Sequence, residues 1–450
     1  MLYKDISKGD LEGFSKVATT LRCISEKLEG TITIVFKPKI GMSLTVIVVG
    51  GGAAGFFGAI ACAAAHPHTR VILLEAGRDP LTKVRISGGG RCNVTHACFD
   101  SLQLTRYYPR GGKALRGAFT RFQAKDTVDW FTRRGVNLKT EADGRMFPTT
   151  DNSATIVNCL MQAAERGKVQ LKTEAKVSDI QFIGAEEKPQ FQVILKSGEQ
   201  LTGDRLLLAT GSQPIGYQLA KKLGHKIIPP VPSLFTFKIK DKRLQDLAGV
   251  AVTTAQVQLP LGKLEQTGPV LITHWGLSGP AVLKLSAWGA RFLQECSYQT
   301  PLKINWLPQM NSEELRQLLL NTKSQYPKKT IATYCPVEIP RRFWQKLVES
   351  IGIQSQQKWA ELSKKQLHQF IQELTQGQYK ILGKGIFKEE FVTCGGVSLK
   401  QVNFKTMESR CCRGLYFAGE ILDIDGITGG FNFQNAWTTG WLAGQGMGQL

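Results

Sequence analysis

The sequence predicts an α/β protein whose main domain is built from two segments of the chain, with a second domain inserted between them. Three observations predict this. A strand, a glycine turn, a helix and a second strand follow one another over residues 44–75. Short hydrophobic strands that end in glycine turns return at 205–211 and 413–420. Alternating strands and helices indicate a mostly parallel sheet, and 450 residues are enough for two or three domains.

Composition limits the possible partners. The chain has 57 basic and 36 acidic residues, a net charge of +21. This excess favours an anionic partner: nucleic acid, an anionic membrane, or phosphorylated cofactors and substrates. A basic solvated surface is the alternative interpretation. The ten cysteines stand singly, except Cys411 and Cys412, so we expect reduced thiols and a cytoplasmic protein.

Two features at the start of the chain concern targeting. Residues 1–43 contain acidic residues and no signal-peptide hydrophobic region, so we expect an extension that is poorly ordered or lies before the functional start at Met42. The run Leu44–Ala65 is uncharged over 22 residues, long enough to span a membrane. Its central glycines divide it into strand, turn and helix, so we expect no membrane span.

The strongest motif is "VIVVGGGAAGFFGA", which places Gly50, Gly52 and Gly55 in the spacing G-x-G-x-x-G between a strand and a helix. Gly50 permits the tight turn, Gly52 lets the backbone approach a pyrophosphate, and Gly55 lets helix and strand pack closely. The next strand ends at Glu75, which can accept hydrogen bonds from a ribose diol. We expect Ala53, Ala54 and Ala76 to contact the same cofactor. FAD and NAD both remain possible at this point.

The end of the chain favours FAD. "GLYFAGEILDIDGITGGFNFQNAW" indicates a buried strand, acidic residues and a helix, an arrangement that closes the FAD domain of many two-dinucleotide-binding flavoproteins. No second G-x-G-x-x-G occurs between residues 100 and 400, so NADH or NADPH would dock transiently. From these segments the expected cofactor contacts are Val177, Ala209, Thr210, Gly211, Gly419, Glu420, Asp423, Gly429, Gly430, Asn432 and Gln434, with the last four facing the flavin ring.

"KVRISGGGRCNVTH", residues 83–96, is expected to form a loop beside the pyrophosphate and the flavin. Its glycines permit close backbone approach. Arg91 can balance phosphate or flavin charge, and Asn93 can hydrogen-bond the ring edge. Cys92, His96 and Cys98 have irregular spacing, so no metal site is expected. The expected cofactor contacts of this segment are Lys83, Ser87, Gly88, Gly89, Arg91, Cys92 and Asn93.

These blocks, together with "GRMFPTTDNSATIV", "THWGLSGPAVLKLS" and "VTCGGVSLKQVNFKTMESR", resemble in order the BaiN/RdsA-like, or YhiN-type, NAD(P)/FAD-dependent oxidoreductases over about residues 44–450. The resemblance implies FAD on a Rossmann-like domain, interrupted by a β-barrel-like piece and a helical piece. It also implies reduction of carbon–carbon double bonds, in unsaturated bile-acid intermediates or in uridine of ribosomal RNA. The family often has Asn in place of His96 and Tyr in place of Phe431, which puts the substrate in question.

The expected domain organisation follows from patterning. The FAD-binding domain comprises 44–232 and 388–450, and the insert spans 233–387. Strand-like alternation of apolar and polar residues predicts a small antiparallel barrel over 233–305. Amphipathic segments predict helices over 306–387, with Ser312 and Ser363 as N-caps.

Catalysis requires a proton donor, and three residues are candidates: Cys92, His274 and Tyr107. A packing role is the alternative for Cys92 and His274. A basic, partly aromatic stretch lies at residues 106–122, and further basic pairs occur at 328–329, 341–342 and 364–365. Basic groups interleaved with aromatics suit RNA, whereas a solvated face is the alternative. The expected RNA contacts are Arg106, Arg110, Lys113, Arg116 and Arg121.

The leading functional prediction is therefore an FAD-dependent reductase of a carbon–carbon double bond, with uridine in ribosomal RNA as substrate. A small unsaturated carbonyl or steroid-like substrate is the alternative within this class. A non-catalytic FAD-binding sensor is the alternative of another class. The sequence does not predict an oligomeric state.

Overall fold

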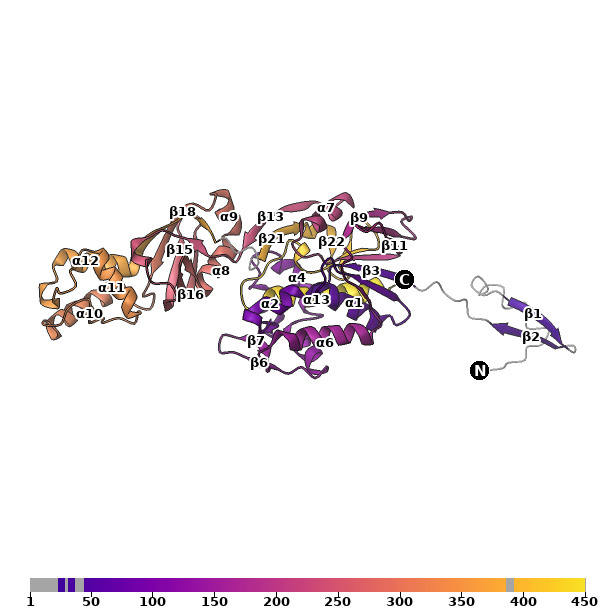
Figure 1. The fold of residues 1–450 in the computed structure, drawn as a ribbon, viewed down its shortest axis with the longest axis horizontal. Helices are drawn as coiled ribbons and strands as arrows, with labels where there is room; N and C mark the ends of the chain where they lie inside the picture. Colours follow the sequence, from indigo (N-terminus) through magenta and orange to yellow (C-terminus); the bar gives the residue numbers. More distant parts are fainter. Residues whose placement is uncertain (1–22, 29–30, 37–43, 386–391, 450) are drawn as a thin grey trace. The chain divides into compact units, whose positions relative to one another are not determined.

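A computed structural model describes residues 23–28, 31–36, 44–385 and 392–449 (Figure 1). Met1–Leu44 and Thr45–Leu450 form two separate units. In the first unit, β1 (Cys23–Leu28) and β2 (Thr31–Phe36) form an antiparallel pair. The remainder of the predicted extension, and the expectation that it is poorly ordered, lie outside the described residues.

The second unit is organised around a seven-stranded sheet with strand order β22-β23-β24-β12-β3-β4-β8. The strands from β24 to β8 run parallel, and β22 and β23 add an antiparallel edge. β3 and β4 are buried on both faces, which explains their continuous hydrophobic sequences. The predicted α/β, Rossmann-like class is confirmed. The strands are β3 (Thr45–Val49), β4 (Arg70–Leu74), β8 (Gln170–Lys172), β12 (Arg205–Leu208), β22 (Val402–Asn403), β23 (Glu408–Ser409) and β24 (Leu415–Phe417).

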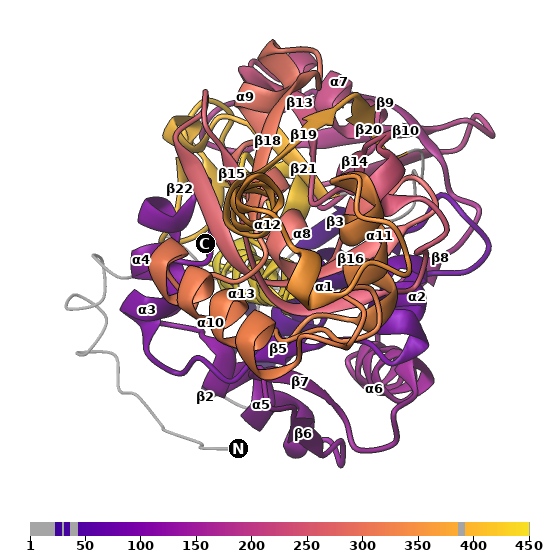
Figure 2. The ribbon, with the colours of Figure 1, turned by 90° about the vertical axis from the view of Figure 1, so that its left-hand side faces the viewer.

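Two parallel-sheet helices from opposite ends of the sequence pack side by side against this sheet: α1 (Ala53–Ala65) and α13 (Phe431–Met447) (Figures 1 and 2). Glycines set their separation. A Cβ atom on Gly440 would lie 2.7 Å from the Ala54 carbonyl oxygen, and one on Gly444 would lie 2.6 Å from the Ala61 Cβ. Because real Cβ atoms do not approach this closely, the two helices can pack at this separation only with glycine at these positions.

Two connections between strands of the parallel sheet carry further elements. The first connects β4 to β8 and carries helices together with a three-stranded sheet of order β5-β7-β6, and the second connects β8 to β12 as an antiparallel meander of order β11-β10-β9. The elements are α2 (Thr82–Gly90), β5 (Thr95–His96), α3 (Ser101–Thr105), α4 (Gly112–Phe119), α5 (Ala124–Thr132), β6 (Leu138–Thr140), β7 (Arg145–Pro148), α6 (Ser153–Arg166), β9 (Val177–Phe182), β10 (Phe191–Leu195), β11 (Gln200–Gly203) and, after β12, α7 (Pro214–Lys222).

An antiparallel pair leads into and out of the insert: β13 (Ile227–Ser233) pairs with β21 (Val392–Val397). The prolines of β13 at positions 229, 230 and 232 cannot donate to a ladder, and the register shifts between Ile228 and Val231. The limits 44–232, 233–387 and 388–450 therefore stay a proposal, because residues 386–391 lie outside the described part of the chain.

The insert contains a seven-stranded antiparallel sheet of order β19-β18-β15-β16-β17-β14-β20. β19 and β20 are separated by one residue and pair with β18 and β14, the strands at the two ends of this order, so the segment 377–384 closes the strands into the predicted barrel. Helix α8 packs against β15, β16 and β17. The elements are β14 (Phe237–Lys238), β15 (Ala251–Leu259), β16 (Leu264–Thr273), β17 (Gly276–Ser278), α8 (Pro280–Trp288), α9 (Ala290–Glu295), β18 (Thr300–Asn305), β19 (Gly377–Ile381) and β20 (Gly383–Lys384).

The helical part of the insert comprises α10 (Ser312–Gln325), α11 (Arg341–Ser350) and α12 (Lys364–Gln376), which face the viewer in Figure 2. Two details differ from expectation. Residues 377–384 return to the sheet as β19 and β20, because "GQYKI" alternates buried and exposed side chains as a strand does. The N-cap of α10 is Asn311 and not the predicted Ser312. The Asn311 side chain accepts hydrogen bonds from the backbone amides of Glu313 and Glu314. Ser363 caps α12 as predicted.

No helix in the described ranges is both long enough and apolar enough to cross a membrane. The uncharged run from Leu44 is divided between β3 and α1, with the glycine turn between them. This division explains why a segment of that length does not form one helix.

Replacing Gly444 by valine is expected to destabilise the protein by about 3 kcal/mol, because the new side chain would overlap α1 and force the helices apart. Urea unfolding followed by circular dichroism measures the loss. The matched control is Gly117→Ala on α4, where a Cβ atom meets nothing within 4 Å and should stabilise the helix by about 0.5 kcal/mol. Equal unfolding midpoints for Gly444→Val and the wild type would contradict the packing described.

Candidate functional site

The turn between β3 and α1 forms an uncovered helix N-terminus. Gly50 has φ of +114°, and a Cβ atom there would lie 2.4 Å from the Ala209 carbonyl oxygen. A Cβ atom on Gly55 would lie 1.9 Å from the Gly50 carbonyl oxygen, whereas one on Gly52 meets nothing within 4 Å. No described side chain caps the first turn of α1. Its free amides and positive dipole end therefore fit an anion such as a pyrophosphate.

The Glu75 carboxylate is held beside this turn. One oxygen accepts a hydrogen bond from the Gly51 amide at 2.8 Å, and the other accepts one from the Gly77 amide at 2.7 Å. The carboxylate is thus fixed in position while each oxygen keeps a free lone pair. These lone pairs fit the hydroxyl donors of a ribose diol.

A second acid reaches the same place from the end of β24. Glu420 forms an ion pair with Lys83 at 2.7 Å and accepts a hydrogen bond from the Thr393 amide at 3.0 Å. The preceding Gly419 has φ of +77°, and a Cβ atom there would lie 2.7 Å from the Ala54 Cβ. The ion pair is largely exposed and contributes little to stability. Its position places a paired cation and anion beside the uncovered end of α1.

The start of α13 is a second uncovered helix N-terminus. Gly429 and Gly430 have φ of +130° and +92°, and no described side chain caps the helix. The Asn93 amide accepts a hydrogen bond from the Gly430 amide at 3.0 Å and donates one to the Thr95 carbonyl at 2.9 Å. Asn93 therefore joins the glycine-rich segment 83–96 directly to the end of α13.

The glycine-rich segment differs in part from the expected loop. It begins as helix α2, which is interrupted at Ser87, Gly88 and Gly89. Gly88, Gly89 and Gly90 have φ of +58°, +68° and +85°, and Cβ atoms on the last two would meet nothing within 4 Å. The three glycines thus provide an exposed left-handed turn, whereas the residues before Ser87, which were expected to lie in a loop, are helical.

Asp423 carries an acceptor without a partner in the described structure. Its Oδ1 atom is buried and unbonded, and burial raises the pKa of this carboxyl, against the opposing effects of Arg291 and Arg110. A buried acceptor without a donor is costly unless a ligand supplies one. The residue therefore fits a hydroxyl-bearing group such as the ribityl chain of a flavin.

Three predicted cofactor contacts lie elsewhere than expected. The fully buried Gln434 accepts hydrogen bonds from Thr95 and Thr127, so it cannot face a flavin ring. Asn432 bridges the amide and carbonyl of Gly426, which closes the loop before α13. Arg91 binds Glu141 at 2.6 Å and lies 4.0 Å from the Phe147 ring centroid, so its charge is already balanced. Local spacing could not reveal these long-range partners.

The three candidate proton donors lie in different surroundings. Cys92 is fully buried, and burial raises the pKa of its thiol to about 12. His274 is exposed in the two-residue turn of the hairpin between β16 and β17. Tyr107 is half-buried and stacks on Phe431, the first residue of α13, at 4.3 Å between ring centroids. Of the three, only Tyr107 adjoins the end of α13.

An aromatic cluster at this point was not predicted as part of the site. His96 stacks on Phe431 at 4.8 Å and lies 5.6 Å from the Tyr107 ring. The His96 Nε2 atom bonds the Asp143 carbonyl, and burial lowers the pKa of this imidazole. The sequence signal was present, because His96 and Phe431 are the two positions that depart from the family pattern.

One of the five predicted RNA contacts is wrong. Arg110 donates to the fully buried Asp425 at 2.6 Å and to the Ala287 carbonyl at 2.7 Å, so it holds α8 of the insert to the loop before α13. Its guanidinium is therefore unavailable to a phosphate. Arg106, Lys113, Arg116 and Arg121 are exposed. They remain predicted contacts.

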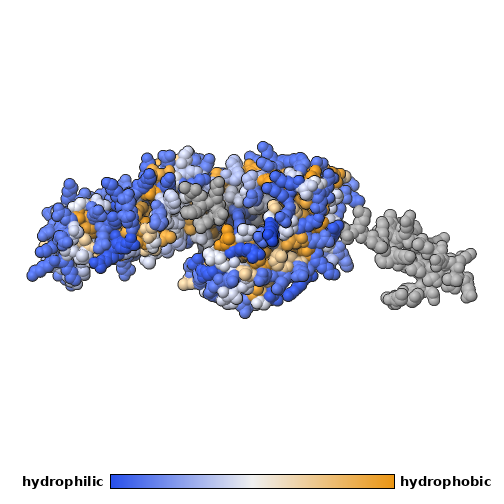
Figure 3. Space-filling model, viewed as in Figure 1, coloured by the Kyte–Doolittle hydropathy of each residue, from blue (hydrophilic) through white to orange (hydrophobic). Residues whose placement is uncertain are grey.

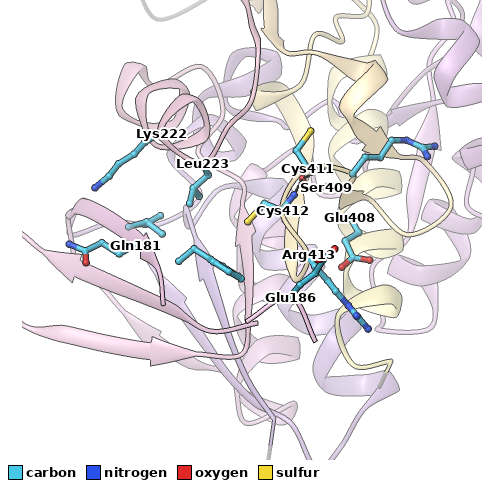
Figure 4. A pocket seen from close by; sticks show the side chains of 12 residues that line it. Gln181, Glu186, Lys222, Leu223, Glu408, Ser409, Cys411, Cys412 and Arg413 are labelled. Atoms are coloured by element: carbon cyan, nitrogen blue, oxygen red, sulfur yellow. Dashed lines mark hydrogen bonds between the residues drawn. The ribbon is translucent and has the colours of Figure 1, made fainter. Parts of the chain in front are cut away.

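A groove of about 870 Å³ lies away from these residues, between the β9–β11 sheet, the end of α7 and residues 408–413 (Figure 4). Arg413 precedes β24, whereas Gly419 follows it. The groove is thus at the amino-terminal edge of the parallel sheet, opposite the uncovered helix ends at its carboxyl edge. In α/β sheets of this type, nucleotides bind at the carboxyl edge.

The comparison with protein families decides the assignment. Residues 44–446 match the family described as the HI0933-like protein Rossmann domain. The chain belongs to the HI0933-like family. It is a flavin-dependent oxidoreductase of this family, and the resemblance to BaiN/RdsA-like flavoproteins is confirmed.

Relatives of this HI0933-like protein include enzymes with two different substrates. It is 31% identical over 409 residues to a 3-dehydro-bile acid delta(4,6)-reductase of Clostridium scindens, covering 88% of this chain and 97% of the relative. It is 30% identical over 413 residues to a ribosomal RNA dihydrouridine synthase of Escherichia coli, covering 89% and 96%. A ribosomal RNA dihydrouridine synthase of Haemophilus influenzae is also 30% identical, with 88% and 96% covered.

Solved structures resemble the chain more distantly. A 3-ketosteroid-delta4-(5alpha)-dehydrogenase from Rhodococcus jostii aligns with a TM-score of 0.47 and 12% identity, covering 92% of this chain and 99% of that one. A flavocytochrome c3 fumarate reductase aligns with a TM-score of 0.43 and 16% identity, covering 91% and 79%. The fold assignment depends on the family match and on the strand order described above.

Glu75→Gln is expected to weaken FAD binding about tenfold or more, because a charge-assisted hydrogen bond to the ribose would be lost. Calorimetric titration of the apoprotein with FAD measures the change. The control is Glu187→Gln on the exposed segment between β9 and β10. If both variants bind FAD as tightly as the wild type, Glu75 does not contact the cofactor.

Proposed function

We propose that the protein reduces the C5=C6 bond of uridine in ribosomal RNA to dihydrouridine, using FAD and an external NADH or NADPH. The observation that carries the proposal is the presence of two uncovered helix N-termini, α1 and α13, at one edge of the parallel sheet. One end suits the pyrophosphate and the other suits the electron-rich edge of a flavin.

The residues that would hold FAD follow from these contacts. Gly50, Gly52 and Gly55 admit the pyrophosphate to the amides of α1, and Glu75 accepts hydrogen bonds from the ribose. Glu420 and Asp423 reach the same edge of the sheet and would meet the ribityl chain. Bound FAD supplies, in its reduced form, a hydride to an activated carbon–carbon double bond.

The residues around α13 would orient the acceptor. Gly429 and Gly430 let this turn lie close against Phe431 and Thr95, where a Cβ atom would clash. An acceptor at this end of α13 would lie beside Tyr107, which stacks on Phe431. No hydrogen bond to the Tyr107 hydroxyl is found among the described residues, so this hydroxyl would be available to donate a proton to the carbon next to the hydride acceptor. We assign Tyr107 as the general acid in preference to the buried Cys92 and the exposed His274.

Charge favours RNA over a small substrate. A net charge of +21 exceeds what a cofactor of two phosphates requires, and phosphate contacts dominate the affinity of proteins for RNA. The bile-acid reductase relative supports the alternative, a small unsaturated carbonyl compound, at nearly the same identity. No second G-x-G-x-x-G is found between residues 100 and 400, so we assign the nicotinamide a transient role.

Tyr107→Phe is expected to lower the rate of product formation about 100-fold or more, because the proton donor would be lost. The reduction of bound FAD by NADH or NADPH should be unchanged, since that step needs no acid at this position. Single-turnover kinetics separates the two steps. Equal product formation by the variant and the wild type would exclude Tyr107 as the acid.

The function itself is tested by mapping dihydrouridine in ribosomal RNA from cells with and without the gene. The proposal expects one or a few uridines to lose the modification, and expects the wild-type gene to restore it. Unchanged ribosomal RNA would reject uridine as the substrate. The same purified enzyme would then be assayed with steroid-like enones, the alternative substrate class.

A further inference from the structure

The helical part of the insert presents a cluster of tyrosines and lysines remote in sequence from the FAD-binding motifs. Tyr326 directly follows α10 and Tyr334 lies in the following loop, with 4.5 Å between their ring centroids. The Lys329 ammonium lies 4.8 Å from the first ring and 4.5 Å from the second. We call Tyr326, Lys328, Lys329, Tyr334 and Lys358 the Tyr–Lys surface.

The backbone under this surface is well supported. The Ile331 amide bonds the Gln357 carbonyl at 2.9 Å, and the Trp359 amide bonds the Lys329 carbonyl at 3.0 Å. The buried Trp344 indole donates to the Ile331 carbonyl at 2.8 Å. These bonds join the segment after α10 to the segment before α12. They therefore hold the lysines of both segments together on the Tyr–Lys surface.

The lysines of the Tyr–Lys surface form no ion pairs in the described structure. Among the described residues, no carboxylate oxygen lies within 4.0 Å of the ammonium groups of Lys328, Lys329 or Lys358. Glu361 lies near Lys358, but its carboxylate accepts a hydrogen bond from the backbone amide of that residue. In the nucleotide-binding part, Lys172 and Lys222 are paired with Glu199 and Asp179, although other lysines there are unpaired.

The whole insert shares this bias. Residues 233–385 contain 20 basic and 10 acidic side chains, so the insert holds nearly half of the excess charge of the protein in about a third of its length. The face shown in Figure 3 is mostly hydrophilic over α10 and α12. Unpaired cations beside half-buried aromatic rings are the combination by which proteins bind single-stranded nucleic acid: the cations contact phosphates and the rings stack on bases.

We propose that the Tyr–Lys surface binds a single-stranded segment of the RNA substrate, with the lysines on phosphates and Tyr334 stacked on a base. This inference rests on the proposed function, because it assigns a docking surface to the same RNA. Lys329 covers both rings in the absence of RNA and moves onto a phosphate when a base takes its place. The surface then adds affinity for long RNA without touching the reacting uridine.

The test measures RNA binding separately from turnover. FAD-loaded full-length protein is titrated into a fluorescein-labelled oligouridylate at several salt concentrations, with fluorescence anisotropy as the readout. The variant carries Lys328→Ala, Lys329→Ala and Lys358→Ala. Loss of three phosphate contacts on a single strand is expected to reduce the slope of log affinity against log salt by about two.

The matched control removes the same charge elsewhere. Lys176, Lys188 and Lys196 are exposed around the β9–β10 sheet and form no ion pair in the described structure, so their triple alanine variant has an equal net charge. The control is expected to keep the wild-type slope. Equal losses in the two triple variants would overturn the inference, since general charge would then explain the binding.

Stacking is tested by a conservative pair. Tyr334→Ala is expected to weaken oligouridylate binding about fivefold or more, whereas Tyr334→Phe keeps the ring and should bind as the wild type does. Equal affinities for the two variants would overturn the stacking role. Circular dichroism melts of both proteins establish that the loop remains folded.

The two proposals fail in different ways. Dihydrouridine formation on ribosomal RNA with an unchanged salt slope in the lysine variant would overturn the surface and leave the function intact. A reduced slope in that variant without dihydrouridine formation by the wild type would overturn the function and support RNA docking. Absence of RNA binding by the wild type would overturn both.

Discussion

The close contact between α1 and α13 is the constraint on which the site depends. The two helices follow parallel strands of one sheet, so their N-termini lie at the same edge. Glycines at 58, 440 and 444 let their backbones touch, which brings the two positive ends within reach of one ligand. Bulkier residues would separate these ends. The same small residues that make the helices poor formers in isolation therefore make the nucleotide site possible.

A second constraint couples the site to the insert. Asp425 is fully buried in the loop before α13, where burial raises the pKa of its carboxyl, and Arg110 and Ser233 oppose that effect by hydrogen bonding. Ser233 ends the strand that leads into the insert, and the same arginine also bonds the last turn of α8. A buried ion pair of this kind adds little net stability, but removing one partner costs about 3–5 kcal/mol. It thus fixes how the loop before α13 meets the insert.

Sequence patterns predicted those features that depend on neighbours along the chain. The G-x-G-x-x-G turn and its acid are local, and Glu75 and Gly52 lie where the spacing placed them. Long-range pairing was the source of the differences. From the sequence alone, Arg110 is one of several basic residues expected on the surface. Its partner Asp425 lies 315 positions later, so their pairing is visible only in the structure. Gln434 was predicted to face the flavin ring, but its side chain accepts hydrogen bonds from Thr95 and Thr127. The strand at 377–381 follows a helix without a break and is recognised only by its alternating burial.

The substrate is the part of the account that the fold itself does not determine. The relatives divide between RNA and a bile acid at nearly equal identity. What differs between these acceptors is charge. A uridine within RNA brings a polyanion with it, and the unpaired cations of the insert have no evident use with a steroid.

The central claim, that the flavin at these helix ends passes its hydride to uridine, is tested most directly by the oxidative half-reaction. The enzyme is reduced anaerobically and mixed with ribosomal RNA that lacks dihydrouridine, and the return of oxidised-flavin absorbance is followed together with dihydrouridine content. The account predicts that the flavin is reoxidised in step with one dihydrouridine formed per flavin. Flavin that stays reduced with RNA, but is reoxidised by an unsaturated ketone, would contradict it.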